Sequence, residues 1–550
     1  MKIFALLIGA AIAAPSNNEL KIGIAQEFEN FNPIIMSMSA TTYMFRMVGR
    51  SLVVLDENSR WVPQLAKTIP TLENKQAQMI DGGKKIVANW EILENAKWGD
   101  GKPVICEDFN SSLKIVNSNT VAVAEKETWT MVEKIEADPK NPKKCKFTYA
   151  KARWDFYQLG NFIPVPSHIE MPVFEKFKNQ KEGYEKNSNY VKNPTNPGLY
   201  SGPYVISEVK LGSHVSFKIN PNFYGKKPSI QSVIVKLIPN TWTLEANLRS
   251  GTIDMVATVG MEVDQAIAFD KKTKSEKLPF KVIFTPSTTY EHIDLNLDNP
   301  MLKDVRVRKA LLYGINREDL VKALFEGKQP VALHNVTPKD AWFTSDSKYI
   351  TQYRYSKREA SKLLDEAGWK MEKDGFRYKD GKKLSFQYMT TANNKTREMV
   401  QVYLQNQWKQ IGIDVTIKNE PARVFFAETT HKRNFPAFAH FAWVSSPEVS
   451  PRSNLHSSQI PSDKNAWSGQ NYTGWKNAEV DTALDQLDIE FNPQKRKELM
   501  HKILKAYTSE LPVLPLYYRT DISVVPAQLK GFTSTGHQFH ETNKIENWSL

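Results

Sequence analysis

From residue 243 onwards, which is little more than the second half of the chain, one plan repeats: a helical pattern, a glycine, and then a β-rich run. Residues 243–256, TLEANLRSGTIDMV, place Gly251 between the two parts, and residues 396–417, TREMVQVYLQNQWKQIGIDVTI, place Gly412 in the same way. Glycine ends helices because it adopts the left-handed backbone conformation without a steric penalty. This repeated alternation predicts an α/β fold, with sheets covered by helices.

Capping residues mark helix boundaries in this half of the chain. Ser356 precedes a helical pattern and Glu359 follows three residues later, which is a capping box, and Gly368 closes the same pattern. Asn316 is placed to cap the helix that follows it. Earlier in the chain, two β-rich runs flank residues 211–213, Leu-Gly-Ser, and predict a hairpin.

The N-terminus predicts export. MKIFALLIGAAIAAPSNNEL carries a lysine, an apolar run over residues 3–14 and then polar residues. The run is too short to span a bilayer, and its small residues fit a cleavage site, so we assign residues 1–14 to a cleaved secretory signal peptide. No cysteine follows the run, which argues against a lipid anchor. We therefore expect a periplasmic protein.

The state of the two cysteines, Cys106 and Cys145, is open in the sequence. Export permits a disulfide between them, and two buried free thiols are the alternative. Nothing marks a histidine partner, so we do not expect a catalytic cysteine.

The charge of the chain does not point to a polyanion. The net charge is +13, but lysines and arginines are spread along the 550 residues beside 60 acids. The densest basic cluster, residues 138–153, is short, and we interpret it as solvated surface. We expect no nucleic-acid partner.

Motifs of catalysis and of cofactor binding are missing. The chain has no His-Glu-x-x-His, Gly-x-Ser-x-Gly, Gly-x-Gly-x-x-Gly, Walker or Cys-x-x-Cys motif. His537 and His540 lack a third metal ligand, and we expect both in a solvated tail. The 13 Trp, 20 Tyr and 27 Phe suit a pocket for ligands with polar and apolar groups. The sequence predicts a binding protein without catalytic residues, metal or cofactor.

Several segments, in fixed order, resemble one known family. They are WVPQLAKTIP (61–70), AKWGDGKPVICEDFNSS (96–112), SGPYVISEVKLGSHVSFKINPNFYGKKPSI (201–230), LRSGTIDMV (248–256), DVRVRKALLYGINREDLVKALFEG (304–327) and SKREASKLLDEAGW (356–369). Their order and spacing are similar to those of the family 5 extracellular solute-binding proteins, the receptors of dipeptide and oligopeptide ABC importers.

The resemblance implies an α/β, two-lobed periplasmic binding protein fold (type II, cluster C), with an extra inserted domain and a hinge between the lobes. The implied parts are residues 17–50, 191–284 and 515–550 for lobe I, residues 51–190 for the inserted domain, and residues 285–514 for lobe III.

The resemblance also implies a function. The protein would capture di- or oligopeptides in a cleft between its lobes and deliver them to the permease of an ABC importer. Its ATPase subunits would be separate chains, in agreement with the missing Walker motif. The peptide backbone would be held like an added strand, with its side chains in hydrated pockets. We expect a monomer.

The recognition segment departs from the family's pattern. Many peptide-binding members have a Trp followed three residues later by an acid, which pairs with the α-ammonium group of the ligand. Trp443 aligns with that Trp, and Ser446, preceded by Ser445, occupies the position of the acid. A neutral serine cannot make a charge-assisted hydrogen bond. Either Glu448 supplies the charge, or the ligand does not require it.

Further ligand contacts are predicted on both sides of the chain. Gln470 and Asn471 carry amides that donate and accept hydrogen bonds together. Near the N-terminus, Asn32 shapes a turn, and Met36 and Met38 are adaptable pocket fillers. Core packing is the alternative for the two methionines.

Other functions stay open. In the same fold, the solute could be an oligosaccharide, a metal chelate or an opine-like compound, because aromatic platforms also serve sugars. A secreted hydrolase is less favoured, although its two carboxylates need no sequence motif. The receptor could also present its ligand to a sensor instead of a permease.

Overall fold

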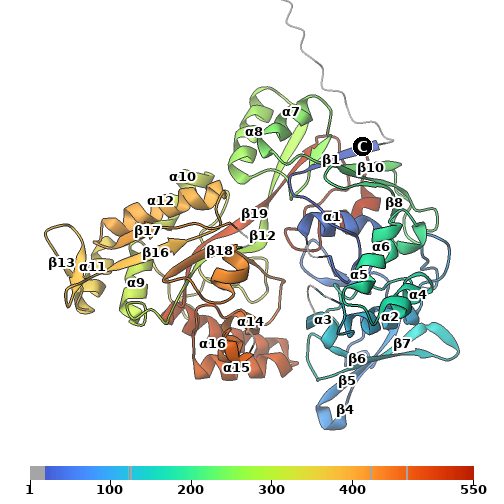
Figure 1. Ribbon diagram of the computed structural model, residues 1–550, viewed down its shortest axis with the longest axis horizontal. Coiled ribbons are helices and arrows are strands. Elements are labelled where there is room, and N and C mark those ends of the chain that lie inside the picture. The colour runs from blue at the N-terminus through green and yellow to red at the C-terminus, as the bar shows by residue number, and fades with distance from the viewer. Residues whose placement is uncertain are drawn as a thin grey trace, which may run out of the picture. The chain divides into compact units, whose positions relative to one another are not determined.

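The computed structural model describes residues 19–36, 38–121, 123, 127–421, 424–465, 467 and 469–550 (Figure 1). The predicted signal peptide lies outside these residues. The chain divides into two compact units: unit 1 comprises residues 1–152, 156–285 and 521–550, and unit 2 comprises residues 153–155 and 286–520. Within the described residues, no helix has the length and apolar character that crossing a bilayer requires.

The boundaries of the two units can be compared with the predicted domain boundaries. One division falls between residues 285 and 286 and another between residues 520 and 521. The predicted ends of lobe III were residues 285 and 514. The predicted inserted domain, residues 51–190, lies within unit 1 apart from residues 153–155, and its separation from lobe I stays a prediction.

The first sheet of unit 1 contains β1 (Glu19–Ile24), β8 (Tyr204–Lys210), β9 (His214–Ile219), β10 (Ser232–Leu237) and β11 (Met255–Val256). The strand order is β11-β1-β10-β9-β8, and the end of β19 (Val513–Pro526) that belongs to unit 1 pairs antiparallel with β11 through Val524 and Val256. Strand β1 pairs in parallel with β10 and β11, whereas β9 pairs antiparallel with β8 and β10. The predicted hairpin at residues 211–213 is confirmed, because β8 and β9 flank it.

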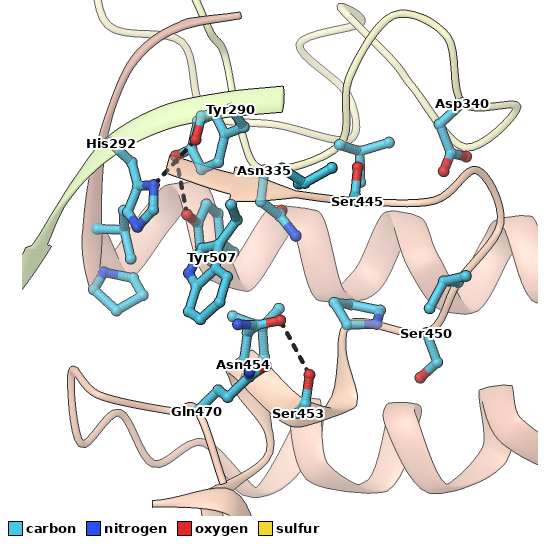
Figure 2. Close-up of a pocket in the computed structure, with 18 of the residues that line it drawn as sticks. Tyr290, His292, Asn335, Asp340, Ser445, Ser450, Ser453, Asn454, Gln470 and Tyr507 are labelled. Carbon is cyan, nitrogen blue, oxygen red and sulfur yellow. Dashed lines mark hydrogen bonds between the residues drawn. The ribbon is translucent and has the colours of Figure 1, made fainter. Parts of the chain in front are cut away.

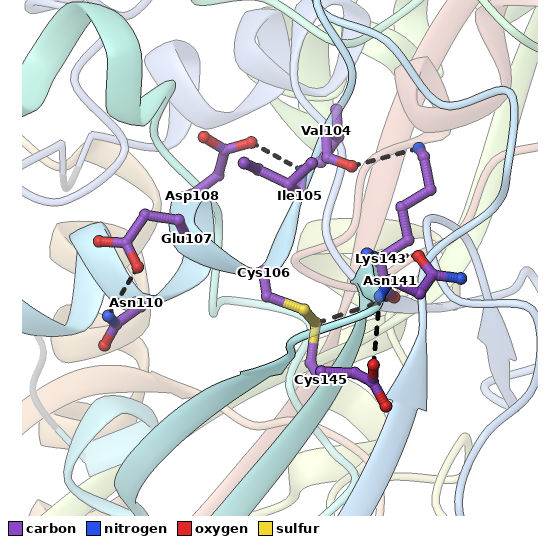
Figure 3. The surroundings of a disulfide bond; sticks show 10 residues. Val104, Ile105, Cys106, Glu107, Asp108, Asn110, Asn141, Lys143 and Cys145 are labelled. Atoms are coloured by element: carbon purple, nitrogen blue, oxygen red, sulfur yellow. Dashed lines mark hydrogen bonds between the residues drawn. A yellow bond between two sulfur atoms is a disulfide. The ribbon is translucent and has the colours of Figure 1, made fainter.

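The second sheet of unit 1 contains β4 (Ala77–Ile80), β5 (Lys85–Glu91), β6 (Val132–Asp138) and β7 (Asn141–Tyr149), in the order β4-β5-β7-β6. Helix α2 (Cys106–Val116) packs against β6 and β7. A disulfide joins Cys106, at the start of α2, to Cys145 in β7 (Figure 3). Of the two states that the sequence leaves open for these cysteines, the structure has the disulfide. The distance of 5.5 Å between the two Cα atoms is typical of a disulfide.

The remaining elements of unit 1 are α1 (Ser39–Val48), β2 (Val53–Leu55), β3 (Trp61–Pro63), η1 (Asp81–Gly83), α3 (Glu127–Thr130), α4 (Ser167–Phe177), α5 (Gly183–Asn187), α6 (Asn189–Lys192), η2 (Pro197–Leu199), η3 (Thr241–Thr243), α7 (Leu244–Arg249), α8 (Val263–Ser275) and η7 (Glu541–Asn547). Strands β2 and β3 form a small antiparallel sheet.

One lysine of the basic cluster is not solvated. Lys143 is buried, and its Nζ donates to the backbone carbonyls of Leu93, Ala96 and Val104 at 3.0, 3.1 and 3.2 Å. Three carbonyl dipoles replace the water that this ammonium group loses. The interpretation of residues 138–153 as solvated surface is therefore wrong for Lys143.

The prediction of a solvated C-terminal tail is also wrong. His537 and His540 are only 4% and 8% exposed. His537 donates from Nε2 to the backbone carbonyl of Asp56 at 2.9 Å, and the hydroxyl of Thr542 donates to the carbonyl of Tyr43 at 2.6 Å. The chain end thus packs against α1, a contact remote in sequence that local polarity does not reveal.

The main sheet of unit 2 contains β16 (Ser385–Met389), β17 (Asp414–Ile417), β18 (Phe438–Val444) and the parts of β12 (Phe280–Leu295) and β19 (Val513–Pro526) that fall within residues 286–520, in the order β17-β16-β18-β12-β19. Strand β16 is parallel to β17 and β18, whereas β12 is antiparallel to β18, so the sheet is mixed. Strands β13 (Lys370–Met371), β14 (Arg377–Lys379) and β15 (Lys382–Lys383) form a small separate sheet.

Helices of unit 2 include α9 (Val305–Tyr313), α10 (Arg317–Phe325), α11 (Lys357–Glu366), α12 (Lys395–Lys409), α14 (Arg452–Leu455), α15 (Ala478–Ile489) and α16 (Pro493–Glu510). Short helical segments are the π-helix η4 (Phe425–Thr430) and the 3-10 helices η5 (Ser457–Gln459) and η6 (Asp463–Asn465). Helix α12 packs beside β17, α9 against α11, and α15 against α16 (Figure 1). The predicted α/β class is confirmed.

Two predicted caps are confirmed in this unit. The Asn316 side chain accepts a hydrogen bond from the backbone N–H of Asp319 at 3.1 Å, at the start of α10. The Ser356 hydroxyl accepts one from the backbone N–H of Glu359 at 3.2 Å, at the start of α11. Each cap satisfies a helix N–H that has no partner within the helix.

Candidate functional site

Unit 2 contains a cavity of about 310 Å³, which we call the unit 2 cavity (Figure 2). Its lining comes from the second half of β12, from a loop within residues 335–342, from residues 443–455 at and after the end of β18, from residues 470–473, from α16 and from residues 512–513. Segments remote in the sequence therefore meet around one space, and the tryptophan-rich stretch between residues 441 and 475 supplies much of its wall.

Strand β12 presents Tyr290, His292 and Asp294 to the cavity, because alternate residues of a strand face the same side. The strand register places Tyr290 opposite Trp443 on β18. The hydroxyl groups of Tyr290 and Tyr507, on α16, lie 3.2 Å apart. The sheet and α16 thus form one aromatic wall of the cavity together, and Asp294 extends this wall along β12.

The His292 ring is fully buried and stacks with aromatic neighbours. Its centroid lies 5.0 Å from that of Tyr290 and 6.4 Å from that of Trp443, with interplanar angles of 11° in both pairs. Its Nδ1 is 3.3 Å from the backbone carbonyl of Tyr290. A carbonyl only accepts, so the neutral ring carries its proton on Nδ1 and leaves Nε2 as an acceptor.

The Nε2 atom of His292 has no hydrogen-bond partner among the described residues. Oδ1 of Asp294 lies 3.3 Å from it, and Asp294 is 3% exposed. In the neutral ring, two acceptors therefore stand side by side at the cavity. Such a pair lacks a donor that hydrogen-bonds to both.

Trp443 is held by ring contacts and by the strand that carries it. Its ring meets Phe441 at 5.3 Å with an interplanar angle of 78°, and Tyr472 at 5.8 Å with an angle of 31°. Two residues later, Ser445 donates both its backbone N–H and its hydroxyl to the carbonyl of Thr288 at 3.0 Å. The indole is thus fixed in the wall while it remains partly exposed.

Asp340 is a second carboxyl group of the cavity, and backbone contacts fix its position. It accepts hydrogen bonds from the backbone N–H groups of Trp342 and Glu448, both at 2.8 Å. Burial raises the pKa of Asp340 to about 6, and these two hydrogen bonds limit the rise. The carboxyl group is thus poised to titrate close to neutral pH.

Polar atoms without partners gather at the cavity. Within the described part of the chain, no hydrogen bond satisfies Asn335 Oδ1, Ser450 Oγ or Asn454 Nδ2, and all three atoms are buried. Their residues, with His292, line the cavity (Figure 2). Buried polar atoms are nearly always hydrogen-bonded in proteins. The cavity therefore suits a ligand, or ordered water, that offers both donors and acceptors.

The adjacent residue on β12, Glu291, belongs to a buried ion-pair network. Burial opposes its ionisation, but Arg397 donates to both carboxylate oxygens, at 3.0 and 3.2 Å, and His440 lies 3.3 Å away. These partners hold the pKa of Glu291 well below its ordinary value. Arg397 therefore forms an ion pair with Glu291 within the protein.

Four of the predicted contact residues line the cavity: Trp443, Ser445, Ser446 and Gln470. Their role in binding stays a prediction. Glu448, which is one of the two alternatives for the acid missing at Ser446, is outside the lining, and its backbone N–H donates a hydrogen bond to Asp340.

Asn471 is fully buried, and its amide group serves the loop itself. Its Nδ2 donates to the carbonyls of Leu455, His456 and Trp475 at 3.3, 3.2 and 2.9 Å. Trp475 is a core residue of unit 2. These bonds shape the wall of the cavity, and direct ligand contact by Asn471 stays a prediction.

The three N-terminal residues of the predicted site belong to unit 1. Asn32 is fully buried and shapes the predicted turn, because its Oδ1 accepts from the backbone N–H of Ile34 at 3.0 Å. Met36 is half-buried, and Met38 is exposed directly before α1. A ligand contact by these residues stays a prediction.

Sequence reasoning missed His292, Asp294 and Asp340. A signal was present for the first two, because Tyr290, His292 and Asp294 are polar or amphipathic residues at alternate positions of a strand, where they share one face. Asp340 follows no such pattern. Its place depends on a loop that meets Glu448 from a remote part of the chain.

The cavity does not form a metal site from protein groups alone. Across the described ranges, no three His, Cys, Asp or Glu side chains gather so that they could hold an ion. His292 Nε2 and Asp294 offer two ligand atoms. A metal ion here would have to arrive with ligands of its own.

Comparison with known families assigns the chain to one class of protein, the bacterial extracellular solute-binding proteins. The model of family 5 of that class (Middle) matches residues 62–466, and the chain belongs to this family. The resemblance seen in the sequence is thus confirmed.

Particular relatives share nearly the whole chain. The oligopeptide-binding protein AppA of Bacillus subtilis is 27% identical over 540 residues, which cover 97% of this chain and 91% of AppA. The oligopeptide-binding protein of Thermus thermophilus, solved with a pentapeptide, has a TM-score of 0.77 at 27% identity and covers 97% of this chain and 96% of its own. NikZ of Campylobacter jejuni, solved with Ni(L-His), has a TM-score of 0.75 at 25% identity and covers 98% and 100%.

Proposed function

We propose that the protein is a periplasmic receptor that captures di- or oligopeptides at the unit 2 cavity and delivers them to the permease of an ABC importer. The observation that carries the proposal is its similarity to oligopeptide-binding AppA over nearly the whole length of both chains. Export by a cleaved signal peptide at residues 1–14, separate ATPase subunits and a monomeric state are parts of the same proposal.

The cavity has the chemistry that a peptide requires. A peptide offers a donor and an acceptor in each amide, and Asn335, Ser450 and Asn454 supply complementary polar atoms that no hydrogen bond from the described residues satisfies. Trp443 and its aromatic neighbours supply apolar area with a fixed orientation. Such a combination of a few polar groups with aromatic walls is typical of ligand sites.

Native mass spectrometry of protein purified without added ligand tests the proposal. We expect retained cargo, and fragmentation of the released species should give differences that match amino-acid residues. Incubation with the same peptides should leave them intact. Sugars or chelates as the only cargo, or hydrolysis of the peptides, would contradict the proposal.

A Trp443→Ala variant tests the place of the site. The substitution removes a large, partly exposed aromatic surface from the cavity wall, so we expect peptide affinity to fall at least about tenfold, which is about 1.4 kcal/mol. The unfolding midpoint should change little. The control is Trp242→Ala, because Trp242 is 75% exposed and belongs to unit 1. Equal affinities of the two variants in calorimetry would place the site elsewhere.

A metal chelate is the second candidate ligand. NikZ was solved with Ni(L-His), and His292 Nε2, which has no hydrogen-bond partner among the described residues, could complete the coordination of a chelated metal ion at the cavity. Calorimetric titration with nickel and histidine together, beside a peptide titration, separates the two candidates.

A further inference from the structure

The formal charge of the unit 2 cavity is opposite to that of the chain. Its ionisable acids are Asp294 and Asp340, and among the described residues neither lysine nor arginine lines it. The chain as a whole carries a net charge of +13. A ligand carboxylate would therefore meet like charge in the cavity, whereas a ligand cation would meet two carboxyl groups.

The His292–Asp294 pair adds an independent requirement. The ring of His292 is fully buried, its Nε2 is an acceptor in the neutral form and has no hydrogen-bond partner among the described residues, and Asp294 Oδ1 lies 3.3 Å away. A nitrogen that carries two or more N–H groups can donate to both atoms at once. Ammonium and guanidinium groups meet this requirement and also bring the compensating positive charge.

The surrounding side chains favour the same chemistry. The rings of Tyr290 and Trp443 lie nearly parallel to that of His292, with centroids 5.0 and 6.4 Å from its centroid. Aromatic faces attract cations through the ring quadrupole. Asp340 is held in place by two backbone N–H groups, so this carboxyl group is positioned before a ligand arrives.

We infer that the unit 2 cavity selects peptides by a cationic nitrogen, which binds at His292 and Asp294 with Asp340 as the second acid. This inference rests on the proposed function, because it assigns the group by which a captured peptide is recognised. The two sources of such a nitrogen are the α-ammonium group of the peptide and the side chain of a Lys or Arg residue. Asp294 and Asp340 then supply the charge that Ser446 lacks.

Matched peptides test the inference. Their length is taken from the native mass spectra, and one position is Lys, Arg, Gln or Glu, each with a free and an acetylated N-terminus. Calorimetry at constant pH and salt should rank Lys and Arg peptides at least about tenfold above the Gln peptide, and the Glu peptide last. If acetylation alone costs at least tenfold, the α-ammonium group is the source, which supports the same inference.

Variants test whether Asp294 and Asp340 cause this ranking of peptide affinities. Asp294→Asn and Asp340→Asn should each reduce the preference for the Lys and Arg peptides over the Gln peptide to less than about threefold, whereas a control variant outside the cavity should keep that preference. The matched control is Asp374→Asn, because Asp374 is exposed in unit 2 and outside the cavity. Asp340 is less buried than Asp294, so its variant keeps the test valid if Asp294→Asn does not fold.

The possible outcomes distinguish a failure of this inference from a failure of the proposed function on which it rests. Peptides that bind equally, whatever their charge and acetylation, would overturn the inference and leave the peptide receptor intact. No binding of any peptide would contradict the proposed function itself. Tighter binding of nickel–histidine than of every peptide would overturn both, because His292 would then serve a metal ion.

Discussion

Glu541 places a carboxyl group in the interior of unit 1, and none of the described cationic side chains forms a hydrogen bond with it. It is 2% exposed, it lines a second cavity of about 170 Å³, and neither carboxyl oxygen has a hydrogen-bond partner within the described part of the chain. Burial raises its pKa to about 8, and the charge of Asp521 adds to the rise. The folded protein therefore favours the neutral carboxyl group at this position.

The free energy of unfolding should consequently fall as the pH rises from 4.5 to about 8. The folded pKa exceeds the ordinary value of 4.5, so the folded chain binds more protons than the unfolded chain in this window. At 1.36 kcal/mol for each pKa unit, the loss is at most roughly 5 kcal/mol. Glu541→Gln removes the titrating group, so it should flatten the profile and be more stable than the parent at pH 8.

Urea unfolding at pH 5 and pH 8 measures this difference. The control is Glu175→Gln, because Glu175 is an exposed acid of unit 1 that pairs with Lys178 on the surface. Its profile should follow that of the parent. If the pH profile of Glu541→Gln were the same as that of the parent, the carboxyl group of Glu541 would not be held neutral by burial.

At the scale of elements, the disulfide fixes the start of α2 to β7. It closes a loop with a sequence separation of 39, and the restriction of the unfolded chain corresponds to about 4 kcal/mol of stability in the loop-entropy model. Reductant should lower the urea midpoint of the parent and leave a Cys106→Ala/Cys145→Ala variant unchanged. A parent midpoint that is insensitive to reductant would contradict this role.

The cap of α11 is a second element with a measurable contribution. Ser356→Ala removes the acceptor for the Glu359 N–H, and we expect a loss of about 1 kcal/mol in the free energy of unfolding. Ser361→Ala, inside the same helix, should be neutral or slightly stabilising, because alanine is the better helix former. Equal effects of the two substitutions in denaturant titrations would contradict the capping role.

These elements also show what a sequence can reveal. The caps at Asn316 and Ser356 and the hairpin at residues 211–213 were predicted correctly, because each depends on residues only a few positions apart. The burial of His537 and His540 was not, because it depends on contacts with α1 and Asp56, far away in the chain. Local polarity carries no information about such contacts.

The candidate site divides in the same way. Trp443, Ser445 and Ser446 were found because a family pattern marks one continuous segment. Asp340 was missed because its hydrogen bond to the Glu448 N–H joins two loops that are remote in sequence. Glu448 itself does not line the cavity. The acid that lines it beside this segment is Asp340, which accepts a hydrogen bond from the Glu448 backbone N–H.

At the scale of the whole molecule, ligand capture and proton binding should be linked. Asp340 has a pKa of about 6 in the ligand-free protein, chiefly through burial, and Glu448 is the charged group that faces it. A bound cation favours the ionised carboxyl group and lowers its pKa, so capture below pH 6 has to release a proton. The affinity for a Lys peptide should therefore fall by up to tenfold for each pH unit below about 6.

The affinity for the acetylated Gln peptide with an amidated C-terminus should stay nearly constant over the same range, because this peptide brings no charge to Asp340. Calorimetry between pH 8 and pH 5 measures both peptides, and Asp340→Asn should remove most of the difference between them. The sign is decisive: a Lys peptide that binds more tightly as the pH falls would mean that the carboxyl groups of the cavity repel the ligand, because their protonation would then relieve the repulsion.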